Sequence, residues 1–392
     1  MKVLRLSPFA LLLGSRLISL TGTGITTVAL ALLVAPPGPT AVGILLLAQS
    51  VPRFGGPLAG AFADRIDQRS LLALCELGQA VLVGFLAFAL PPFPVVVSVA
   101  AASSCLATLF APAGRAAVPQ LVTEAGRIRA YALLGTALNL QLALGPILGG
   151  LLVTAGGPRW ALGADASTFL ISALLLTRLP GLPASSSSTA RPRLIRSSLQ
   201  GLVYLARTRV LRTLAAGTFL VVAFAAVDNV ALLFLARDEL HAGSSGYGLL
   251  LGSYGTAMLL VSLGVASAAR RLPGPAVLVV LGVTCTGGGL ALTGLAPDLA
   301  VALATQAVAG AGNSLENVAS DRLVQLASQP HLLGRAFGSI GTAAFGGQTA
   351  AYILAGPLVA LTSPRWALTV AGMGALLALP LLVFGLRRTS SA

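Results

Sequence analysis

Six ionisable residues interrupt long apolar stretches of this 392-residue sequence. Such groups bind and release protons or pair with opposite charges, and a charged side chain at the centre of a helix in hydrocarbon costs about 2.5 to 3.5 kcal/mol. We therefore expect each of them to face a polar cavity, to pair, or to lie near a helix end. The six residues are Arg16, Arg53, Glu76, Asp165, Asp228 and Glu316.

Glu316 belongs to a stripe of polar residues. The stripe has the spacing i, i+3, i+4 and i+7, which is one face of a helix, and consists of Asn313, Glu316, Asn317 and Ser320. In apolar surroundings this face must look inward. Glu316 is therefore the first candidate for a protonatable site, and a structural carboxyl group hydrogen-bonded between helices is the alternative.

A similar stripe lies near the N-terminus and consists of Arg16, Ser19, Thr23 and Thr26. We expect it to line a polar interior together with the first stripe. A proton that neutralises Asp228 or Glu316 would then loosen a charge pair with Arg16 or Arg53.

Several kinds of chemistry are excluded. Lys2 is the only lysine, so the phosphate-binding loop G-x-x-x-x-G-K-[ST] cannot occur and the chain alone cannot drive pumping with ATP. Two histidines in loops, His241 and His331, cannot assemble a nucleophile, a base and an orienting group, so we predict no enzyme and no cofactor. The cysteines lie in apolar runs without C-x-x-C spacing and predict neither a disulfide nor a metal site. They are Cys75, Cys105 and Cys285.

The composition indicates a membrane protein. Apolar residues make up 56% of the chain and charged residues 9%, with a mean hydropathy of +0.91, whereas soluble domains have about 25% charged residues. Runs of about 20 apolar residues are long enough to span a bilayer, and they leave no length for a separate soluble domain. The predicted helices are 8–34, 40–62, 70–90, 93–112, 129–155, 160–179, 210–235, 243–268, 274–295, 298–319, 334–361 and 365–386.

The basic residues predict the orientation. If the helices alternate in direction, 20 of the Lys and Arg residues lie on one side and three on the other, namely Arg159, Arg237 and Arg365. The positive-inside rule then places both termini in the cytoplasm, in a multi-pass protein of the cell membrane. A cleavable signal peptide is the alternative for residues 8–34, but Arg16 would interrupt its apolar region. The net charge of +14 is scattered and predicts no nucleic-acid partner.

The chain repeats itself at an offset of 206 residues. The sequence Pro158-Arg-Trp-Ala-Leu162 recurs as Pro364-Arg-Trp-Ala-Leu368, and two further motifs recur at the same offset. Because each copy holds six helices, the copies share one orientation and should be related by an axis along the membrane normal. We predict an N-terminal bundle at 1–180, a cytoplasmic linker with a short amphipathic helix at 181–209, and a C-terminal bundle at 210–392.

After the second predicted helix the chain reads Gly60-Ala-Phe-Ala-Asp64-Arg65-Ile-Asp67-Gln-Arg69. This resembles the loop motif G-x-x-x-D-R-x-G-x-R of the major facilitator superfamily. An acidic residue at Asp67, where most members have glycine, resembles the branch of macrolide-efflux and enterobactin-exporter proteins. The resemblance implies a fold of twelve transmembrane helices in two pseudo-symmetric six-helix bundles.

The resemblance also implies roles for these loop residues. They would form a conformational latch in which Gly60 permits close helix approach, Asp64 caps or pairs with a helix end, and Arg65 and Arg69 hold acidic or carbonyl groups across the seam between the bundles. Simple cytoplasmic anchoring is the alternative. Gly145, Pro146, Gly149 and Gly150 resemble the antiporter motif of the fifth helix and would permit bending and tight packing against the facing bundle, or ordinary packing.

In the resembled fold the first, fourth, seventh and tenth helices line the cavity, and the second forms part of the seam. Asp228 and Asn229 would then lie in a cavity helix, with a coupling or substrate role, or alternatively an outer gate or a pairing role. Arg53 on the seam would pair with an acid in one conformation. Glu76 and Asp165 lie on supporting helices, near helix ends, where we expect structural hydrogen bonds.

Members of this branch often carry an acid after the glycine of the first helix, but Thr23 follows Gly22 here. This moves the expected proton coupling to Asp228 and Glu316. The resemblance implies a proton-coupled exporter of amphipathic drugs or secondary metabolites, an antiporter that confers drug resistance and acts as a monomer. A siderophore or anionic-metabolite exporter is the second reading, and a non-transporting membrane sensor or scaffold is the alternative from another class.

Overall fold

The computed structural model describes residues 7–63, 65–183, 204–268, 273–329 and 332–386. These residues form helices and short connections and contain no strand, which confirms the all-α fold class. Nine of the described helices are long and apolar enough to cross a membrane.

The twelve predicted spans all have helical counterparts in the described residues. One of the nine, α6 (Arg127–Leu176), contains two spans. The second predicted span is interrupted, because α2 (Pro39–Ser50) and α3 (Gly56–Ala63) are joined by a short 3-10 helix, η1 (Val51–Gly55). The tenth span is α12 (Leu299–Ala327), which carries the polar stripe around Glu316 and is therefore less apolar than its neighbours.

The first unit comprises the described parts of Met1–Val34 and Ala48–Ala190. Its helices include α1 (Pro8–Leu33), α4 (Gln68–Ala89), α5 (Phe93–Leu121) and α6, with a 3-10 turn, η2 (Glu124–Gly126), before α6. The most extensive packing in the unit is that of α1 on α6, and α4 packs on both α5 and α6. A core of buried apolar side chains, Leu12, Leu72, Phe110 and Leu176 among them, closes one part of this unit.

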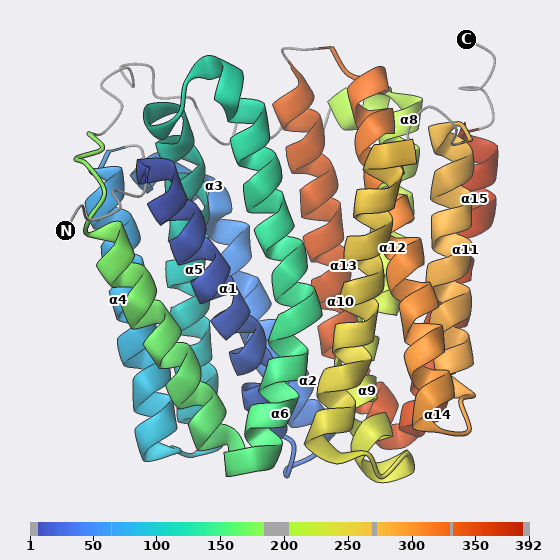
Figure 1. Cartoon of the computed structure of the whole chain (residues 1–392). Helices are drawn as coiled ribbons and strands as arrows, with labels where there is room; N and C mark the ends of the chain where they lie inside the picture. The colour runs from blue at the N-terminus through green and yellow to red at the C-terminus, as the bar shows by residue number, and fades with distance from the viewer. Residues whose placement is uncertain (1–6, 64, 184–203, 269–272, 330–331, 387–392) are drawn as a thin grey trace. The chain divides into compact units, whose positions relative to one another are not determined.

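Gly157 divides α6 into two antiparallel helices. Its backbone has φ 76° and ψ 178°, a conformation that side chains with a Cβ atom rarely adopt. Figure 1 shows the chain turning back at this end of the unit. The glycine therefore allows the fifth and sixth spans to follow each other with almost no loop.

The second unit comprises the described parts of Ala35–Leu47 and Arg191–Ala392. Besides most of α2, its helices are α8 (Arg209–Ala225), α9 (Asp228–Phe234), the π-helical turn η3 (Leu235–Glu239), α10 (Gly243–Ala268), α11 (Pro275–Gly294), α12, α13 (Leu333–Leu361), α14 (Pro364–Leu376) and α15 (Ala378–Leu386). The main packing partners are α11 with α12, α10 with α12, α11 with α14, and α13 with α8. Residues 184–203, with most of the predicted amphipathic helix, lie outside the described residues, so the three-part division of the chain stays a prediction.

The internal repeat has a structural counterpart. The helices α12 and α13 begin 206 residues after α5 and α6, at Leu299 and Leu333. Arg159 donates to the carbonyl oxygen of Phe88 at the end of α4 (3.3 Å). Its counterpart Arg365 donates to the carbonyl oxygens of Ala296 (2.6 Å) and Gly294 at the end of α11. Each arginine thus satisfies C-terminal carbonyl groups of the third span in its own repeat.

Small residues bring α1 and α6 into backbone contact. A Cβ atom at Gly145 would lie 2.6 Å from the Cα atom of Gly24, and a Cβ atom at Gly149 would lie 3.0 Å from the Ile25 carbonyl oxygen. We expected this glycine motif to pack against the facing bundle or to serve ordinary packing. These contacts are made to α1 in the same unit, as in ordinary packing. Pro146 is buried and causes no break, since Gly157 is the one residue within α6 with non-helical dihedral angles.

We predict that Gly145→Ala destabilises the protein by about 1 to 3 kcal/mol, because the added methyl group would overlap the α1 backbone. Thermal unfolding of the purified protein in detergent measures this effect. Gly135→Ala is the matched control in the same helix, where an added Cβ atom has no neighbour within 4 Å. It should be neutral or stabilising by up to about 1 kcal/mol. Equal unfolding temperatures for the two variants would contradict the packing argument.

Candidate functional site

The predicted stripe on α12 is divided between two environments. The Glu316 side chain is 6% exposed and Ser320 is 9% exposed, whereas Asn317 is exposed and Asn313 is half-buried. The Asn317 amide donates to Asn313 Oδ1 (2.8 Å). The four residues span a wide arc of the helix, so packing against α10 and α11 covers one edge and leaves the other open.

Close helix packing positions Glu316. A Cβ atom at Gly282 of α11 would lie 2.6 Å from the Glu316 backbone nitrogen, so only glycine permits this approach of α11 to α12. The oxygen Oε2 of Glu316 is buried and has no hydrogen-bond partner among the described residues. A buried carboxyl oxygen of this kind has unused capacity for a proton or a polar ligand.

Asp228 at the start of α9 lies in the same neighbourhood as Glu316. Both carboxyl groups interact electrostatically with the hydroxyl group of Tyr254 on α10, and Asp228 also interacts with Tyr247, one heptad earlier on that helix. We call Asp228, Tyr247, Tyr254 and Glu316 the carboxyl cluster. Tyr254 is therefore the shared neighbour of the two predicted acids, and neither tyrosine was predicted as a site residue. Their spacing of seven residues on one helix was the available signal.

Asn229, the next residue after Asp228, forms its side-chain hydrogen bond within its own turn of the chain. Its side-chain amide donates to the carbonyl oxygen of Ala226 (3.2 Å), and the residue is half-buried. This bond stabilises the turn between α8 and α9.

The polar residues of α1 turn towards the interior of the first unit. Ser19 is 2% exposed and donates to Glu76 Oε1 (3.0 Å), and Thr26 is 8% exposed. Thr23 donates to the Ser19 carbonyl oxygen of its own helix (2.9 Å). The expectation that Ser19 and Thr26 line a cavity is therefore corrected. They face the side of α1 that packs on α6 and that meets Glu76 of α4, where two acids require hydrogen-bond donors.

Arg16 has a partner within this unit. Its guanidinium group lies over the Phe110 ring, 4.4 Å from the centroid, and interacts electrostatically with Glu76. We predicted a charge pair of Arg16 with Asp228 or Glu316. Among the described residues, the carboxyl group that interacts with Arg16 is that of Glu76, in the same unit. Arg53 is exposed and makes no ion pair with any described residue.

Glu76 and Asp165 are more deeply placed than expected. Both are 0% exposed and lie well inside α4 and α6 instead of near the ends of their spans. Each carboxyl group accepts the expected hydrogen bond, Glu76 from Ser19 and Asp165 from Thr168 (2.9 Å).

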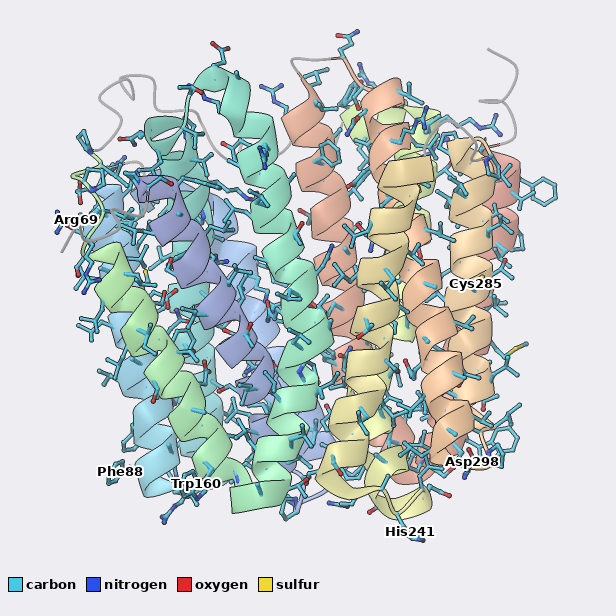
Figure 2. The ribbon with its side chains drawn as sticks, viewed as in Figure 1. Arg69, Phe88, Trp160, His241, Cys285 and Asp298 are labelled. Atoms are coloured by element: carbon cyan, nitrogen blue, oxygen red, sulfur yellow. The ribbon has the colours of Figure 1, made fainter. Side chains whose placement is uncertain are left out.

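The loop motif joins two helix ends of the first unit. Asp67 accepts hydrogen bonds from the backbone nitrogens of Ser70 (2.8 Å), which caps α4, and of Leu182 (2.9 Å), beyond the end of α6. The Arg69 guanidinium donates to the carbonyl oxygen of Thr177. Figure 2 shows Arg69 at the opposite end of the unit from Phe88 and Trp160. Asp67 and Arg69 therefore tie α4 to the end of α6.

Two other described motif residues, Gly60 and Arg65, make no part of this connection. Asp64 lies outside the described residues, and Arg65 is exposed. A Cβ atom at Gly60 would meet only Pro112 Cβ, at the ordinary contact distance of 3.8 Å. Gly60 therefore does not serve a close helix approach here, which corrects that expectation.

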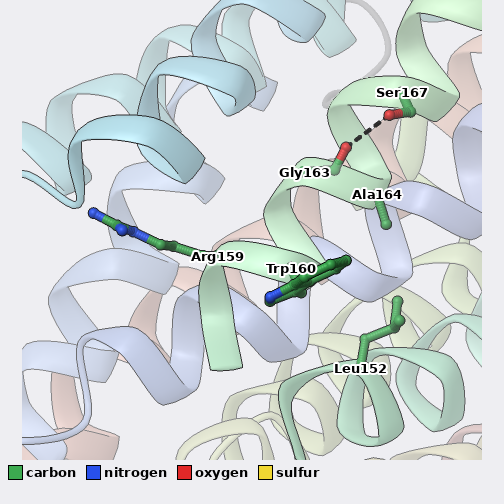
Figure 3. A pocket seen from close by; sticks show the side chains of 6 residues that line it. All are labelled: Leu152, Arg159, Trp160, Gly163, Ala164 and Ser167. Atoms are coloured by element: carbon green, nitrogen blue, oxygen red, sulfur yellow. Dashed lines mark hydrogen bonds between the residues drawn. The ribbon is translucent and has the colours of Figure 1, made fainter. Parts of the chain in front are cut away.

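An open groove of about 490 Å³ lies along the second half of α6. Figure 3 shows its lining residues, with the Trp160 ring along one wall and Arg159 directed away. Trp160 is 71% exposed, as is common for tryptophan at a membrane interface. The groove contains no acidic residue and none of the predicted site residues. Its lining consists of Leu152, Arg159, Trp160, Gly163, Ala164 and Ser167.

The described residues contain no group of three or more His, Cys, Asp or Glu side chains that could hold a metal ion. Separately, the candidate site residues include four carboxyl groups within membrane-spanning helices, on Glu76, Asp165, Asp228 and Glu316.

Comparisons with known proteins agree on a class. A family model described as transmembrane secretion effector, of the major facilitator superfamily, matches residues 2–391. The multidrug efflux pump Tap of Mycolicibacterium fortuitum is 28% identical over 90% of this chain and 89% of its own. The enterobactin exporter EntS of Shigella boydii is 24% identical over 82% of this chain and 77% of its own.

Solved structures show the same fold. The crystal structure of the nucleoside transporter NupG matches with a TM-score of 0.81, covering 97% of this chain and 100% of that one at 13% identity. An identity this low indicates a shared architecture and carries no information on what is transported.

We predict that Asp67→Ala lowers stability more than Asp298→Ala. Asp298 also caps a helix, by accepting from the Val301 backbone nitrogen (2.9 Å), but makes no hydrogen bond to a distant described segment. A lost cap costs about 1 kcal/mol, and the bond from Leu182 adds to this for Asp67. Thermal unfolding in detergent at neutral pH measures both variants. Equal losses would show that the bond to Leu182 contributes nothing.

The same variant has a predicted pH dependence. Burial pushes the pKa of Asp67 upwards, but hydrogen bonds from Ser70 and Leu182 and the charge of Arg69 outweigh burial and hold the pKa below its ordinary value of 3.8. The stabilisation is therefore complete above that value and is lost as the pH falls through the lowered value. The difference in unfolding temperature between wild type and Asp67→Ala should become smaller only in strongly acidic buffer.

Proposed function

Because this chain belongs to the transmembrane secretion effector family of the major facilitator superfamily, we propose that it is an alternating-access exporter that exchanges protons for amphipathic drugs or secondary metabolites. It is a multi-pass membrane transporter of this superfamily, and its relatives include efflux pumps and a siderophore exporter. The proposal adds the direction, the coupling ion and the substrate class.

The carboxyl cluster of the second unit is the observation that carries this proposal. Asp228 and Glu316 lie in membrane-spanning helices and share the neighbourhood of Tyr254. Neither carboxyl group forms an ion pair with a described basic residue. Ionisable residues in such segments are costly, and they commonly mark proton or substrate pathways.

The proposed mechanism follows from the cost of an unpaired charge. An ionised carboxyl group is stable where water reaches it, and a protonated one is stable where the protein closes over it. A proton that enters from outside and binds Asp228 or Glu316 therefore favours the closed arrangement on that side and permits the change to the other. Release of the proton inside resets the cluster.

The two amides of the stripe are the proposed substrate contacts. Asn313 and Asn317 form one hydrogen-bonded pair beside the buried Glu316, so a polar patch adjoins the protonatable group. An amphipathic compound with a cationic or amide group fits such a patch. Thr23 and Asn229 satisfy backbone carbonyl groups and are assigned positioning roles.

The loop tie made by Asp67 and Arg69 is proposed to keep α4 and α6 together as a rigid pair during the transition. Both termini are proposed to lie in the cytoplasm of a cell-membrane protein that acts as a monomer. The excess of basic residues on one side of the predicted helices supports this orientation.

A siderophore or other anionic metabolite is the second substrate class. The enterobactin exporter relative supports it. The anion would require free arginines near the pathway, and Arg16 is engaged with Phe110 and Glu76, which leaves Arg53 as the exposed candidate. For this reason we propose amphipathic drugs or metabolites ahead of anionic compounds.

We predict that Glu316→Gln abolishes efflux driven by a pH gradient, because glutamine cannot bind and release a proton. The measurement is uptake of the fluorescent cation ethidium into inverted vesicles, in parallel with iron-free enterobactin as the anionic probe. Asp321→Asn is the matched control, since Asp321 is an exposed acid on the same helix. Full gradient-driven uptake by Glu316→Gln would show that the assignment of Glu316 is wrong.

A second experiment separates a transporter from a membrane sensor or scaffold. Cysteines are introduced at Asn313 and Asn317 in a chain without its three native cysteines, and at Val308, which is 47% exposed on another part of α12. For a transporter, the labelling rate at 313 and 317 should change with ethidium and with the pH gradient, while the rate at 308 stays constant. Unchanged rates at all three positions would favour a non-transporting role.

A further inference from the structure

Two carboxyl groups of the first unit are fully buried and lie beside one face of α1. Ser19 of α1 donates to Glu76 Oε1 (3.0 Å). One turn later, a methyl group at Gly22 would overlap Asp165 Oδ1 and Thr168 Oγ1. Because Gly22 has no side chain, the Asp165 carboxyl group lies directly against the α1 backbone. The two acids, from α4 and α6, thus meet adjacent turns of one helix and interact electrostatically with each other.

The charges around these acids do not balance. From α1, Arg16 interacts with Glu76, and from α5 the exposed Arg115 acts on Arg16. From α4, the Cys75 thiol lies beside Glu76, and α6 contributes Asp165 itself. One guanidinium group near the pair thus faces two carboxyl groups that are 0% exposed. Uncompensated charge in such surroundings is strongly unfavourable. The cluster reaches neutrality only when one carboxyl group holds a proton.

Unused hydrogen-bonding atoms lie around the pair. Glu76 Oε2 and Asp165 Oδ2 are buried and have no hydrogen-bond partner among the described residues. Thr26 Oγ1 (residue 8% exposed) and Ser172 Oγ (0% exposed) also have none. Thr26 interacts with Asp165 and Ser172 with Glu76, without regular hydrogen-bond geometry. A protonated carboxyl group has an O–H donor in addition to its acceptor capacity, so this arrangement has room for one more hydrogen.

We propose that Glu76 and Asp165, together with Arg16, form a proton-binding site inside the first unit, distinct from the carboxyl cluster of Asp228 and Glu316. The site holds one proton, shared between the two carboxyl groups, while Arg16 balances the remaining charge. The hydroxyl groups of Ser19 and Thr168 orient the two carboxyl groups. This inference goes beyond the proposed function, because it concerns protonation of the resting protein and requires no transported compound.

Infrared difference spectroscopy of the purified full-length protein tests the proposal. The difference between mildly acidic and mildly alkaline buffer should contain the carbonyl stretch of a protonated carboxyl group. Part of this band should disappear in Glu76→Gln and in Asp165→Asn. Glu124→Gln, which alters an exposed acid of η2, is the matched control and should leave the band unchanged. Spectra of both test variants identical to wild type would overturn the proposal.

The variant Arg16→Met should increase the carbonyl band that the acid variants decrease. Without the guanidinium group both carboxyl groups require a proton. The intensity that the Glu76–Asp165 pair contributes to the carbonyl band should therefore be about twofold higher in Arg16→Met than in wild type. An unchanged band in a folded Arg16→Met protein would overturn the charge-balance argument. A structural role for the two acids alone would not produce this increase.

Thr26→Val and Ser172→Ala keep the test valid if the acid variants fail to fold. Each retains both carboxyl groups and removes one hydroxyl group that faces them. The frequency of the carbonyl stretch should shift in at least one of these variants, since that stretch depends on hydrogen bonding. Bands at the wild-type frequency in both would contradict the proposal. Loss of ethidium transport in Glu316→Gln has no bearing on these spectra, so the two proposals fail independently.

Discussion

The structure depends on one constraint: a polar group inside a membrane-spanning helix has to find its partner within the protein, because hydrocarbon offers none. Arg159 and Arg365 meet this requirement at helix ends, where each binds the last carbonyl groups of a neighbouring helix. Glu76 and Asp165 meet it in the interior, through hydroxyl groups of α1 and α6. The polar residues thereby determine which helices are neighbours.

Close helix approach is the complement of this constraint. Lipid provides no hydrophobic drive for helices to associate, so van der Waals contact between small residues contributes much of the stabilisation. Gly24 with Gly145 in the first unit and Gly287 with Gly372 in the second remove side chains where two backbones meet. Gly22 serves both close packing and polar contact, since the absence of a side chain allows the Asp165 carboxyl group to lie against the α1 backbone. Packing and polar contacts on α1 thus depend on the same short segment.

Much of the fold could be predicted from the sequence because hydropathy and repetition are local properties. The first span, predicted at 8–34, is Pro8–Leu33, and the offset of 206 reappears in the helix starts. The predicted tenth helix ended at residue 319, whereas α12 continues to Ala327, since polar residues at the water interface still favour helix. The kink at Gly157 left no loop between two spans. These differences concern ends and connections.

The partners of the polar residues could not be predicted, because they depend on the rotation of each helix about its axis. A stripe such as that of Arg16, Ser19 and Thr26 satisfies the same physics whether it lines a cavity or faces acids on neighbouring helices. Sequence spacing establishes that these residues share a face, and only packing establishes that α6 lies against it and that Glu76 of α4 meets Ser19 there. Glu76 has the structural hydrogen bond that we expected, but it lies well inside α4 and not near a helix end.

The two acid pairs differ in a way that assigns them different tasks on our proposals. Glu76 and Asp165 accept hydrogen bonds from hydroxyl groups in a fully buried setting, with one guanidinium group beside them. Asp228 is half-buried, Glu316 adjoins the hydrogen-bonded amides of Asn313 and Asn317, and neither carboxyl group accepts a hydrogen bond from another described side chain. Fixed hydrogen-bond donors hold a carboxyl group in one protonation state, whereas access to water allows its protonation state to change. The second unit is therefore suited to exchange protons during each cycle, and the first to retain one.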